Sequence, residues 1–172
     1  SGVSRSIKLE PKDQYGNLLE PKIVSRSTAN TIAIGVKATA GSFDSVNDQP
    51  LGNESIAIGT LSKALANGSI AVGADASASG VNSSSFGRGS NASARNSTAI
   101  GAFSKSLGSF STAIGTRSKA TKYSSTAVGT EAQASGTNAT ALGRLSKASN
   151  NSAIAIGVSA NASGNGSQAL GY

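Results

Sequence analysis

A fourteen-residue repeat constrains the fold of this chain more than any other feature. The triplet of Ala, an aliphatic residue and Gly recurs at this spacing from Ala57-Ile58-Gly59 to Ala169-Leu170-Gly171. Ser85-Phe86-Gly87 fills one slot in phase, and the Gly of Ala33-Ile34-Gly35 precedes Gly59 by 24 residues, which is one repeat plus ten. The chain therefore holds ten repeat units, nine of them in unbroken register.

Each unit contains two segments with the period-two pattern of β-strands. Before the Gly, a large apolar residue follows a small one, as in Ala113-Ile114. After the Gly, the third and fifth residues are Ala or Ser and the fourth is polar, as in Ala132-Gln133-Ala134. Gly at the junctions permits the positive φ values or close backbone approaches of tight corners. Two strands and two corners in fourteen residues predict one coil of a parallel β-solenoid.

The composition indicates that the interior of this solenoid is narrow. The 172 residues include 32 Ser, 28 Ala and 21 Gly, but only 4 Phe, 3 Tyr and no Trp. At about 25 cal/mol per Å², such small side chains provide too little core for a lone chain, so we expect an oligomer. The large apolar residues before each Gly form a ladder that fills one side of the coil or faces another chain, and alternation does not decide between the two. This ladder comprises Ile58, Val72, Phe86, Ile100, Ile114, Val128, Leu142, Ile156 and Leu170.

The absence of His and Cys excludes several classes of function. The usual transition-metal sites, thiol nucleophiles and Ser-His-Asp triads cannot be built from this chain. Six of the eight acidic residues lie within residues 1–54, and no catalytic constellation is visible. We therefore expect a protein that is not an enzyme and that has no cofactor and no metal. No apolar stretch is long enough to span a membrane as a helix.

The excess positive charge lies in the regular repeats. Residues 55–172 carry nine basic residues against Asp75 and Glu131, whereas residues 1–54 are neutral overall. Four Lys residues follow a repeat Gly by four positions and should align as a broken column: Lys63, Lys105, Lys119 and Lys147. The column either attracts an acidic partner or forms a solubilising surface that blocks edge pairing. Aromatic residues are not interleaved along it, which argues against nucleic acid as a partner.

One group of repeats combines cations with aromatic rings on what we expect to be a single face, and we predict that this face binds a protein ligand. Exposed rings beside cations have the chemistry of protein-binding hot spots. Burial of these rings between protomers is the alternative. The residues concerned are Phe103, Lys105, Phe110, Arg117, Lys119, Lys122 and Tyr123.

The motif inside the repeats resembles that of a known family. Residues 96–104 read Asn-Ser-Thr-Ala-Ile-Gly-Ala-Phe-Ser, which is similar to the N-S-V-A-I-G-x-x-S head repeat of the YadA-like trimeric autotransporter adhesins. Residues 55–62 and 68–73 carry the same motif, and the likeness covers about residues 30–172. The resemblance implies an all-β, left-handed parallel β-roll assembled as a homotrimer. It also implies a virulence-related adhesin on the surface of a Gram-negative bacterium, binding a host matrix protein such as collagen or a cell-surface receptor.

Two regions depart from the repeat. Residues 1–29 do not match it and are expected to form a hairpin or irregular cap, with the head roll over residues 30–172. The ten-residue insertion near residues 42–52 should leave the roll as a loop. Members of the family continue into a stalk and an anchor, so we expect attachment to the outer membrane only through a C-terminal anchor that this sequence lacks.

Two alternative functions remain open. Thr98, Thr112, Thr126 and Thr140 form a regular column, and flat Thr arrays on β-solenoids occur in ice-binding proteins. Only one Thr per coil lines up, and at only four levels. A purely structural solenoid spacer is the other alternative.

Overall fold

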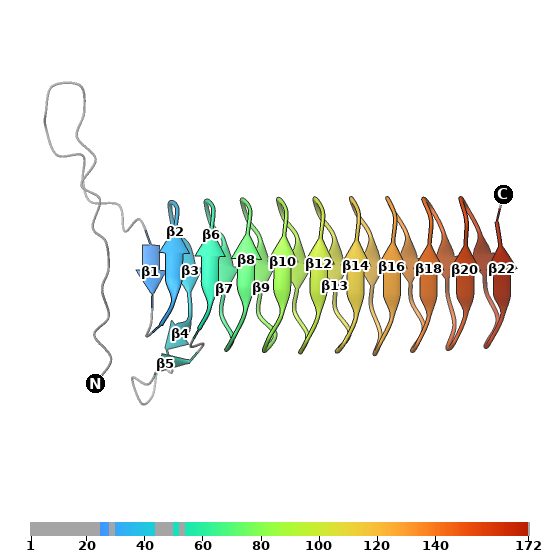
Figure 1. Ribbon diagram of the computed structural model, residues 1–172, viewed down its shortest axis with the longest axis horizontal. Coiled ribbons are helices and arrows are strands. Elements are labelled where there is room, and N and C mark those ends of the chain that lie inside the picture. The colour runs from blue at the N-terminus through green and yellow to red at the C-terminus, as the bar shows by residue number, and fades with distance from the viewer. Residues whose placement is uncertain (1–24, 28–29, 44–49, 52–53, 172) are drawn as a thin grey trace, which may run out of the picture.

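The computed structural model describes residues 25–27, 30–43, 50–51 and 54–171, most of which wind into one regular solenoid (Figure 1). Strands alternate between two parallel sheets of ten strands each, so every coil adds one strand to each sheet. In Figure 1 the first sheet lies in front with its strands running upward and the second lies behind it, so the chain turns in a left-handed sense as it advances. The left-handed parallel β-roll expected from the sequence is confirmed.

Three-residue strands, one per coil, form the first sheet. They are β2 (Ile32–Ile34), β6 (Ile56–Ile58), β8 (Ile70–Val72), β10 (Ser84–Phe86), β12 (Thr98–Ile100), β14 (Thr112–Ile114), β16 (Thr126–Val128), β18 (Thr140–Leu142), β20 (Ile154–Ile156) and β22 (Gln168–Leu170). Neighbouring strands pair at the repeat spacing, so Ile100 lies beside Ile114.

Shorter strands form most of the second sheet. The strands of the second sheet are β1 (Ser25–Ser27), β3 (Ala38–Ala40), β7 (Lys63–Ala64), β9 (Ser77–Ala78), β11 (Asn91–Ala92), β13 (Lys105–Ser106), β15 (Lys119–Ala120), β17 (Gln133–Ala134), β19 (Lys147–Ala148) and β21 (Asn161–Ala162). The register again follows the repeat, because Lys105 pairs with Lys119.

Small side chains fill the space between the two sheets. Apart from Gly, every buried residue in the described part of the chain is Ala or Ser, and Ala113 and Ala120 are completely buried. Most buried hydroxyls find partners within the coil, as where Ser118 Oγ donates to the carbonyl oxygen of Gly115 at 2.9 Å, whereas Ser83 Oγ is buried without a partner. A buried hydroxyl without a partner costs about 1–3 kcal/mol, so these bonds make Ser acceptable in the interior. The two sheets therefore lie close together with no room for larger residues.

The corners of each coil are held in left-handed backbone conformations. Gly115 has a φ of +122°, and a Cβ there would lie only 2.6 Å from the carbonyl carbon of Gly129 in the next coil. Non-glycine residues also adopt positive φ, with 56° at Arg117 and 50° at Ser124. The repeat Gly is therefore required both by its φ and by the close stacking of neighbouring coils.

The apolar ladder lies on the outside of the roll. Ile114 retains 36% of its accessible surface and Leu142 retains 44%. In each strand the residue before the ladder position, such as Ala113, points inward instead. Of the two places that the sequence allowed, the structure excludes the interior of the coil.

The ten-residue insertion interrupts the chain between β3 and β6 without disturbing the roll. Ile34 still pairs with Ile58 across the extra residues. Within the insertion, β4 (Ser42–Phe43) and β5 (Pro50–Leu51) form an antiparallel pair below the roll in Figure 1. Residues 1–24 and 28–29 lie outside the described residues, and β1 joins the second sheet beside β3. The division into a cap over residues 1–29 and a roll over 30–172 stays a prediction.

Candidate binding surfaces

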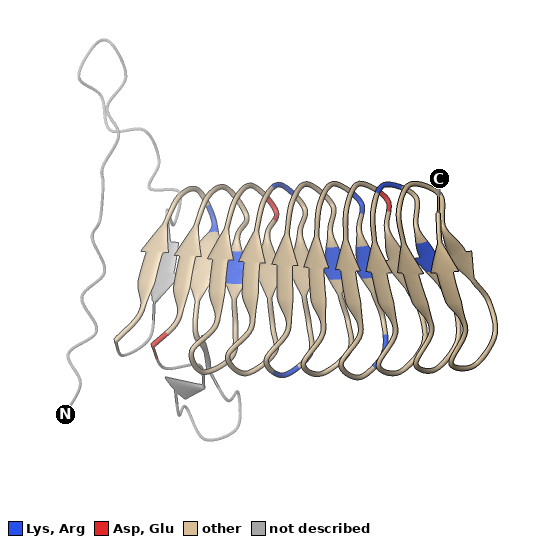
Figure 2. Cartoon of the chain, turned by 45° about the vertical axis from the view of Figure 1, so that its right-hand side comes forward, with Lys and Arg blue, Asp and Glu red and all other residues tan. Residues whose placement is uncertain are grey.

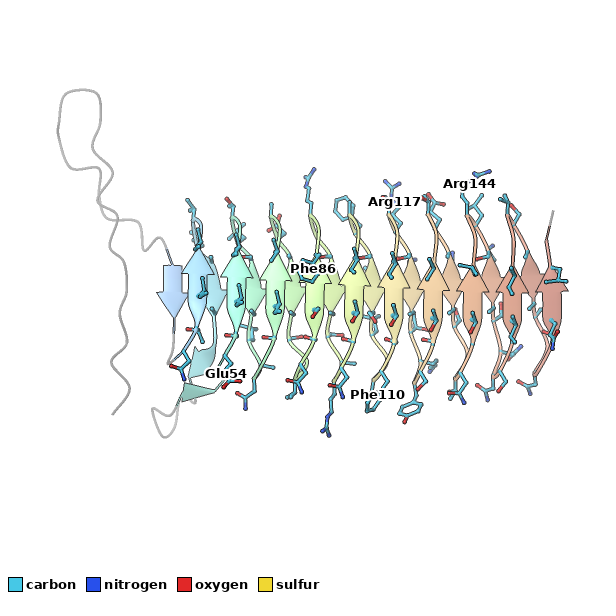
Figure 3. The ribbon with its side chains drawn as sticks, viewed as in Figure 1. Glu54, Phe86, Phe110, Arg117 and Arg144 are labelled. Atoms are coloured by element: carbon cyan, nitrogen blue, oxygen red, sulfur yellow. The ribbon has the colours of Figure 1, made fainter. Side chains whose placement is uncertain are left out.

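The outer side of the first sheet is an uncharged strip, which we call the apolar face. It consists of the outward first and third residues of strands β2 to β22 of the first sheet. The third position carries the ladder, and the first carries Ile, Thr, Ser or Gln. Phe86, which is labelled on the first sheet in Figure 3 and is 37% exposed, occupies one level of the ladder. The apolar face therefore presents a continuous row of large apolar side chains.

The ladder residues are only partly covered within one chain. Neighbours above and below pack against each side chain, so the 36% exposure of Ile114 or the 40% exposure of Ile156 is directed away from the sheet. Covering this remainder contributes about 1 kcal/mol for each ladder residue. Contiguous apolar strips of this length mark interaction sites on soluble proteins. The geometry is therefore suited to burial against another apolar surface.

The outer side of the second sheet has a different chemistry, and we call it the cationic face. Its strand positions carry Lys63, Lys105, Lys119 and Lys147, and the turns that lead into it carry Arg88, Arg117 and Arg144. All seven residues are exposed. The predicted column is confirmed, because Lys105 lies beside Lys119 and Lys147 pairs with Gln133. Figure 2 shows basic residues on these strands and at the turns.

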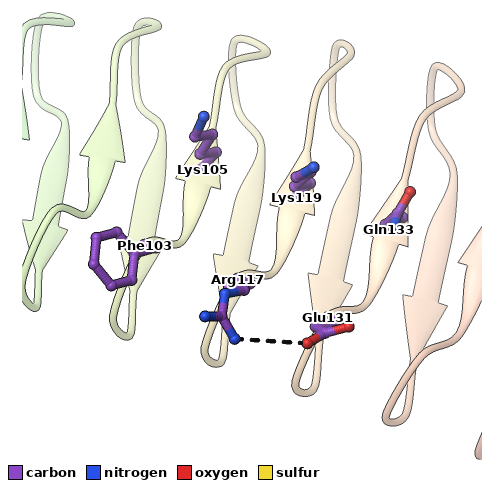
Figure 4. Close-up of a pocket in the computed structure, with 6 residues that line it drawn as sticks. All are labelled: Phe103, Lys105, Arg117, Lys119, Glu131 and Gln133. Carbon is purple, nitrogen blue, oxygen red and sulfur yellow. Dashed lines mark ion pairs between the residues drawn. The ribbon is translucent and has the colours of Figure 1, made fainter.

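An open depression of about 510 Å³ lies on the cationic face. Its lining residues, drawn in Figure 4, are Phe103, Lys105, Arg117, Lys119, Glu131 and Gln133. Three come from strands β13, β15 and β17, and three come from the turns that precede these strands. Four of the seven predicted ligand-binding residues therefore meet here: Phe103, Lys105, Arg117 and Lys119.

Two charge interactions organise the turn side of this depression. Arg117 Nη1 lies 3.8 Å from Glu131 Oε1, with both side chains well exposed. The guanidinium carbon of Arg88 lies 5.6 Å from the centre of the Phe103 ring, within the range of a cation–π contact. Phe103 itself is 43% exposed. An exposed ring and several cations are therefore available to one ligand.

The remaining predicted residues lie on the opposite edge of the roll. Phe110 and Tyr123 form an edge-to-face pair with ring centres 5.6 Å apart, and Lys122 precedes Tyr123 in the same row of turns. Figure 3 shows Phe110 on the lower edge and Arg117 on the upper edge. Our expectation that all seven residues share one surface is therefore wrong. Seven residues separate Phe103 from Phe110, which is half a coil, and half a coil carries the chain to the other edge.

Two residues of the depression, Glu131 and Gln133, were not among those predicted from the sequence. Glu131 follows Arg117 by fourteen residues, and Gln133 follows Lys119 by fourteen. Repeat spacing alone therefore indicated that each lies beside its predecessor. The exposed rings Phe110 (49%) and Tyr123 (55%) remain accessible in a single chain, and their role in ligand binding stays a prediction.

Neither a metal site nor a membrane-spanning helix is found among the described residues. No group of three or more His, Cys, Asp or Glu side chains in this part of the chain is placed to hold a metal ion. The same residues include no helix long and apolar enough to cross a membrane.

Comparison with known proteins relates this chain to one family. The family model described as YadA head domain repeat (2 copies) matches residues 51–76, 78–104, 95–118, 106–132, 120–146 and 148–172. Among solved structures, the chain is similar to the crystal structure of the collagen-binding domain of Yersinia adhesin YadA. The TM-score is 0.58 at 26% sequence identity, over 84% of this chain and 82% of that chain. Among curated proteins no sequence matches.

Proposed function

Since this chain belongs to the YadA head domain repeat family, we propose that it is the head of a bacterial surface adhesin that works as a homotrimer. The observation that carries the proposal is the apolar face, which a single chain leaves uncovered over the length of the first sheet. Three copies that turn this face toward a common axis bury the ladder at every level. The interior of Ala and Ser is too poor in apolar area to offset the chain entropy alone.

The trimer then presents its other face to the host. With the apolar face buried, the second sheet and both rows of turns point outward, and these carry the exposed rings and cations. We propose that these surfaces bind a host matrix protein such as collagen, or a cell-surface receptor. The similarity to a collagen-binding domain supports the matrix protein. The proposed activity is adhesion without catalysis, in the service of virulence, with the head anchored to the outer membrane of a Gram-negative cell.

Sedimentation equilibrium tests the assembly. We expect a single species of three times the 16.8 kDa chain mass. A folded monomer at micromolar concentration would contradict the proposal. The trimer is then passed over immobilised collagen and over an unrelated protein as a control, and saturable binding to collagen alone is the expected result.

An ice-binding solenoid is the competing function, and the placement of the Thr column bears on it. Thr112 and Thr126 pair on the first sheet and share the apolar face with the ladder. In the proposed trimer this face is buried, so the column has no access to ice. Inhibition of ice growth by the chain, with no protein ligand, would support the competing function instead.

A further inference from the structure

We propose that the cationic face is a binding track for a linear sulfated polysaccharide of the glycosaminoglycan class. The inference begins with the segregation of charge on the roll. Ten basic residues have described side chains, and eight of them lie on the strands of the second sheet or on the turns that lead into it: Lys37, Lys63, Arg88, Lys105, Arg117, Lys119, Arg144 and Lys147. Only Arg95 and Lys122 lie on the opposite edge. The apolar face has no charged residue among its described strands.

Hydrogen-bond donors fill the positions between the cations. The outward position of the second sheet carries a hydroxyl, an amide or an ammonium group at every level from β3 to β21. In order these residues are Thr39, Lys63, Ser77, Asn91, Lys105, Lys119, Gln133, Lys147 and Asn161. Sulfate, carboxylate and sugar hydroxyl oxygens all accept hydrogen bonds from such groups.

The donors are arranged along a straight line. Consecutive levels are paired parallel strands, such as β13 with β15 and β15 with β17, so they repeat at about 4.8 Å. Six levels separate Lys63 from Lys147, which is about 29 Å. A linear polymer with regularly repeated anions can contact several of these cations at once. Once one anion is bound, its neighbours on the polymer are held close to the other cations, so several weak contacts together give a higher affinity.

The absence of apolar side chains from the outward strand positions of the described cationic face favours a polysaccharide over a folded protein as its partner. Protein interfaces are centred on buried aromatic or aliphatic side chains. On the outward strand positions of the cationic face no described residue is apolar. Its turns carry the exposed side chains of Val36, Leu61, Phe103 and Val158, of which Phe103 is the one aromatic ring among the described residues there. A single exposed ring beside cations suits the packing of one sugar ring in the depression. A hydrophilic, strongly charged chain matches the rest of the face.

The cations are free to engage such a ligand. Lys105 and Lys119 are exposed, and the one ion pair among the described residues of this face, between Arg117 and Glu131, is an exposed contact at 3.8 Å. Exposed pairs of this kind contribute little to stability because solvent screens them, so a sulfate can replace Glu131 as the partner of Arg117. The inference rests on the proposed function in one respect: the trimer must leave the second sheet on the outside.

Titration of the 172-residue chain with heparin oligosaccharides of graded length tests the inference. We expect affinity to rise with length until the ligand spans about 29 Å and then to level off. Replacing Lys105 and Lys119 together by Gln keeps hydrogen-bonding side chains but removes two charges, and should weaken binding at least tenfold. The matched control replaces Arg95 and Lys122 by Gln on the opposite edge. It removes the same charge and should change affinity less than twofold.

Three outcomes would overturn the inference. Equal losses in the two double variants would show that net charge alone attracts the ligand. Undiminished binding of desulfated oligosaccharides would exclude recognition of sulfate, and equally tight binding of polyglutamate of matched charge would identify an acidic polypeptide as the partner. Trimer mass and collagen binding are measured on the same samples. Loss of either, with heparin binding retained, would count against the proposed function and not against this site.

Discussion

The two outer faces of this roll are built on similar parallel sheets and carry different chemistry. Both belong to ten-stranded parallel sheets that advance one coil at a time. At the outward positions, the first sheet presents Ile100 and Ile114 while the second presents Lys105 and Lys119. Because residues fourteen apart pair in register, the residue type at one repeat position forms a continuous surface along the whole molecule. The interior is much the same under both faces, so only the outward positions distinguish them.

This difference indicates that inward and outward positions of the repeat have different roles. Inward positions accept only Ala or Ser, because the sheets lie close together. Outward positions are free of that restriction and are uniform only where a function requires it. The ladder is apolar at each of its described levels, whereas the cationic face carries Lys at some levels and neutral donors at the others. We infer that the first face meets a constant partner, namely its own copies, and that the second meets a polar ligand that tolerates gaps.

The largest expected difference is between a charge substitution on the apolar face and one on the cationic face of the same coil. Ile114→Asp should abolish or severely weaken the trimer, because three unpaired carboxylates would be buried at one level at several kcal/mol. Lys119→Glu, five residues away, should leave the assembly intact. Melting temperature and sedimentation equilibrium of both variants make the comparison. Equal melting temperatures would mean that the apolar face is not buried.

A second substitution acts at the corner where the chain passes from one face to the other. Gly115→Ala places a Cβ 2.6 Å from the carbonyl carbon of Gly129 at a φ of +122°. We expect a loss of about 3 kcal/mol or more, from the clash and the strained backbone together. Thr116→Ala, at the exposed neighbouring position, is the control and should change stability by less than about 0.5 kcal/mol. Chemical denaturation measures both, and similar midpoints would disprove the close stacking of coils.

A third prediction concerns the aromatic rings on the two edges. If the Phe103 ring anchors the ligand, Phe103→Ala should weaken binding to a matrix protein by about 2 kcal/mol of binding free energy. This loss should appear as a faster dissociation rate. Tyr123→Ala on the opposite edge should then have little effect. Raising the salt concentration should slow association more than it speeds dissociation, because the cations guide the encounter. Surface plasmon resonance with each variant separates the edges, and loss of the trimer in either variant would assign its ring to the protomer interface.

The smallest effect is expected from the ion pair on the cationic face. Arg117 and Glu131 lie 3.8 Å apart in exposed positions, so solvent screens their attraction. A double-mutant cycle with Ala at each position should give a coupling energy of about 0.2–0.5 kcal/mol in the free protein. A value above about 1 kcal/mol would show that this pair holds the turns together and is not readily available to a ligand.

Most of the fold could be predicted because a repeat multiplies each local signal. One Ala-Ile-Gly triplet is weak evidence, but the same triplet at Gly101, Gly115 and Gly129 fixes coil length, strand positions and register together. The side to which Ile114 points could not be settled, since an alternating pattern shows that two faces differ without showing which faces inward. The volume between the two sheets decides the direction of the Ile side chain. Since only Ala and Ser fit between the sheets, an inward Ile has no space.

The candidate site was only partly predictable for a related reason. Phe103 and Phe110 are near in sequence and both stand at corners, yet a coil has two corners on opposite edges. Residues separated by a multiple of fourteen lie on the same edge, and this rule groups Phe103 with Arg117 and Glu131. The pairing of Arg88 with the Phe103 ring depends on side-chain conformation and could not be read from spacing.

The preserved pairing of Ile34 with Ile58 across ten inserted residues has an evolutionary consequence. Each coil needs only a matching neighbour, so gain or loss of a whole unit changes the length of the head by about 4.8 Å and leaves every other contact as it was. Extra residues at a corner are held outside the roll, as β4 and β5 are here. Lineages can therefore adjust the reach of the head, and graft new loops onto it, without evolving a new core.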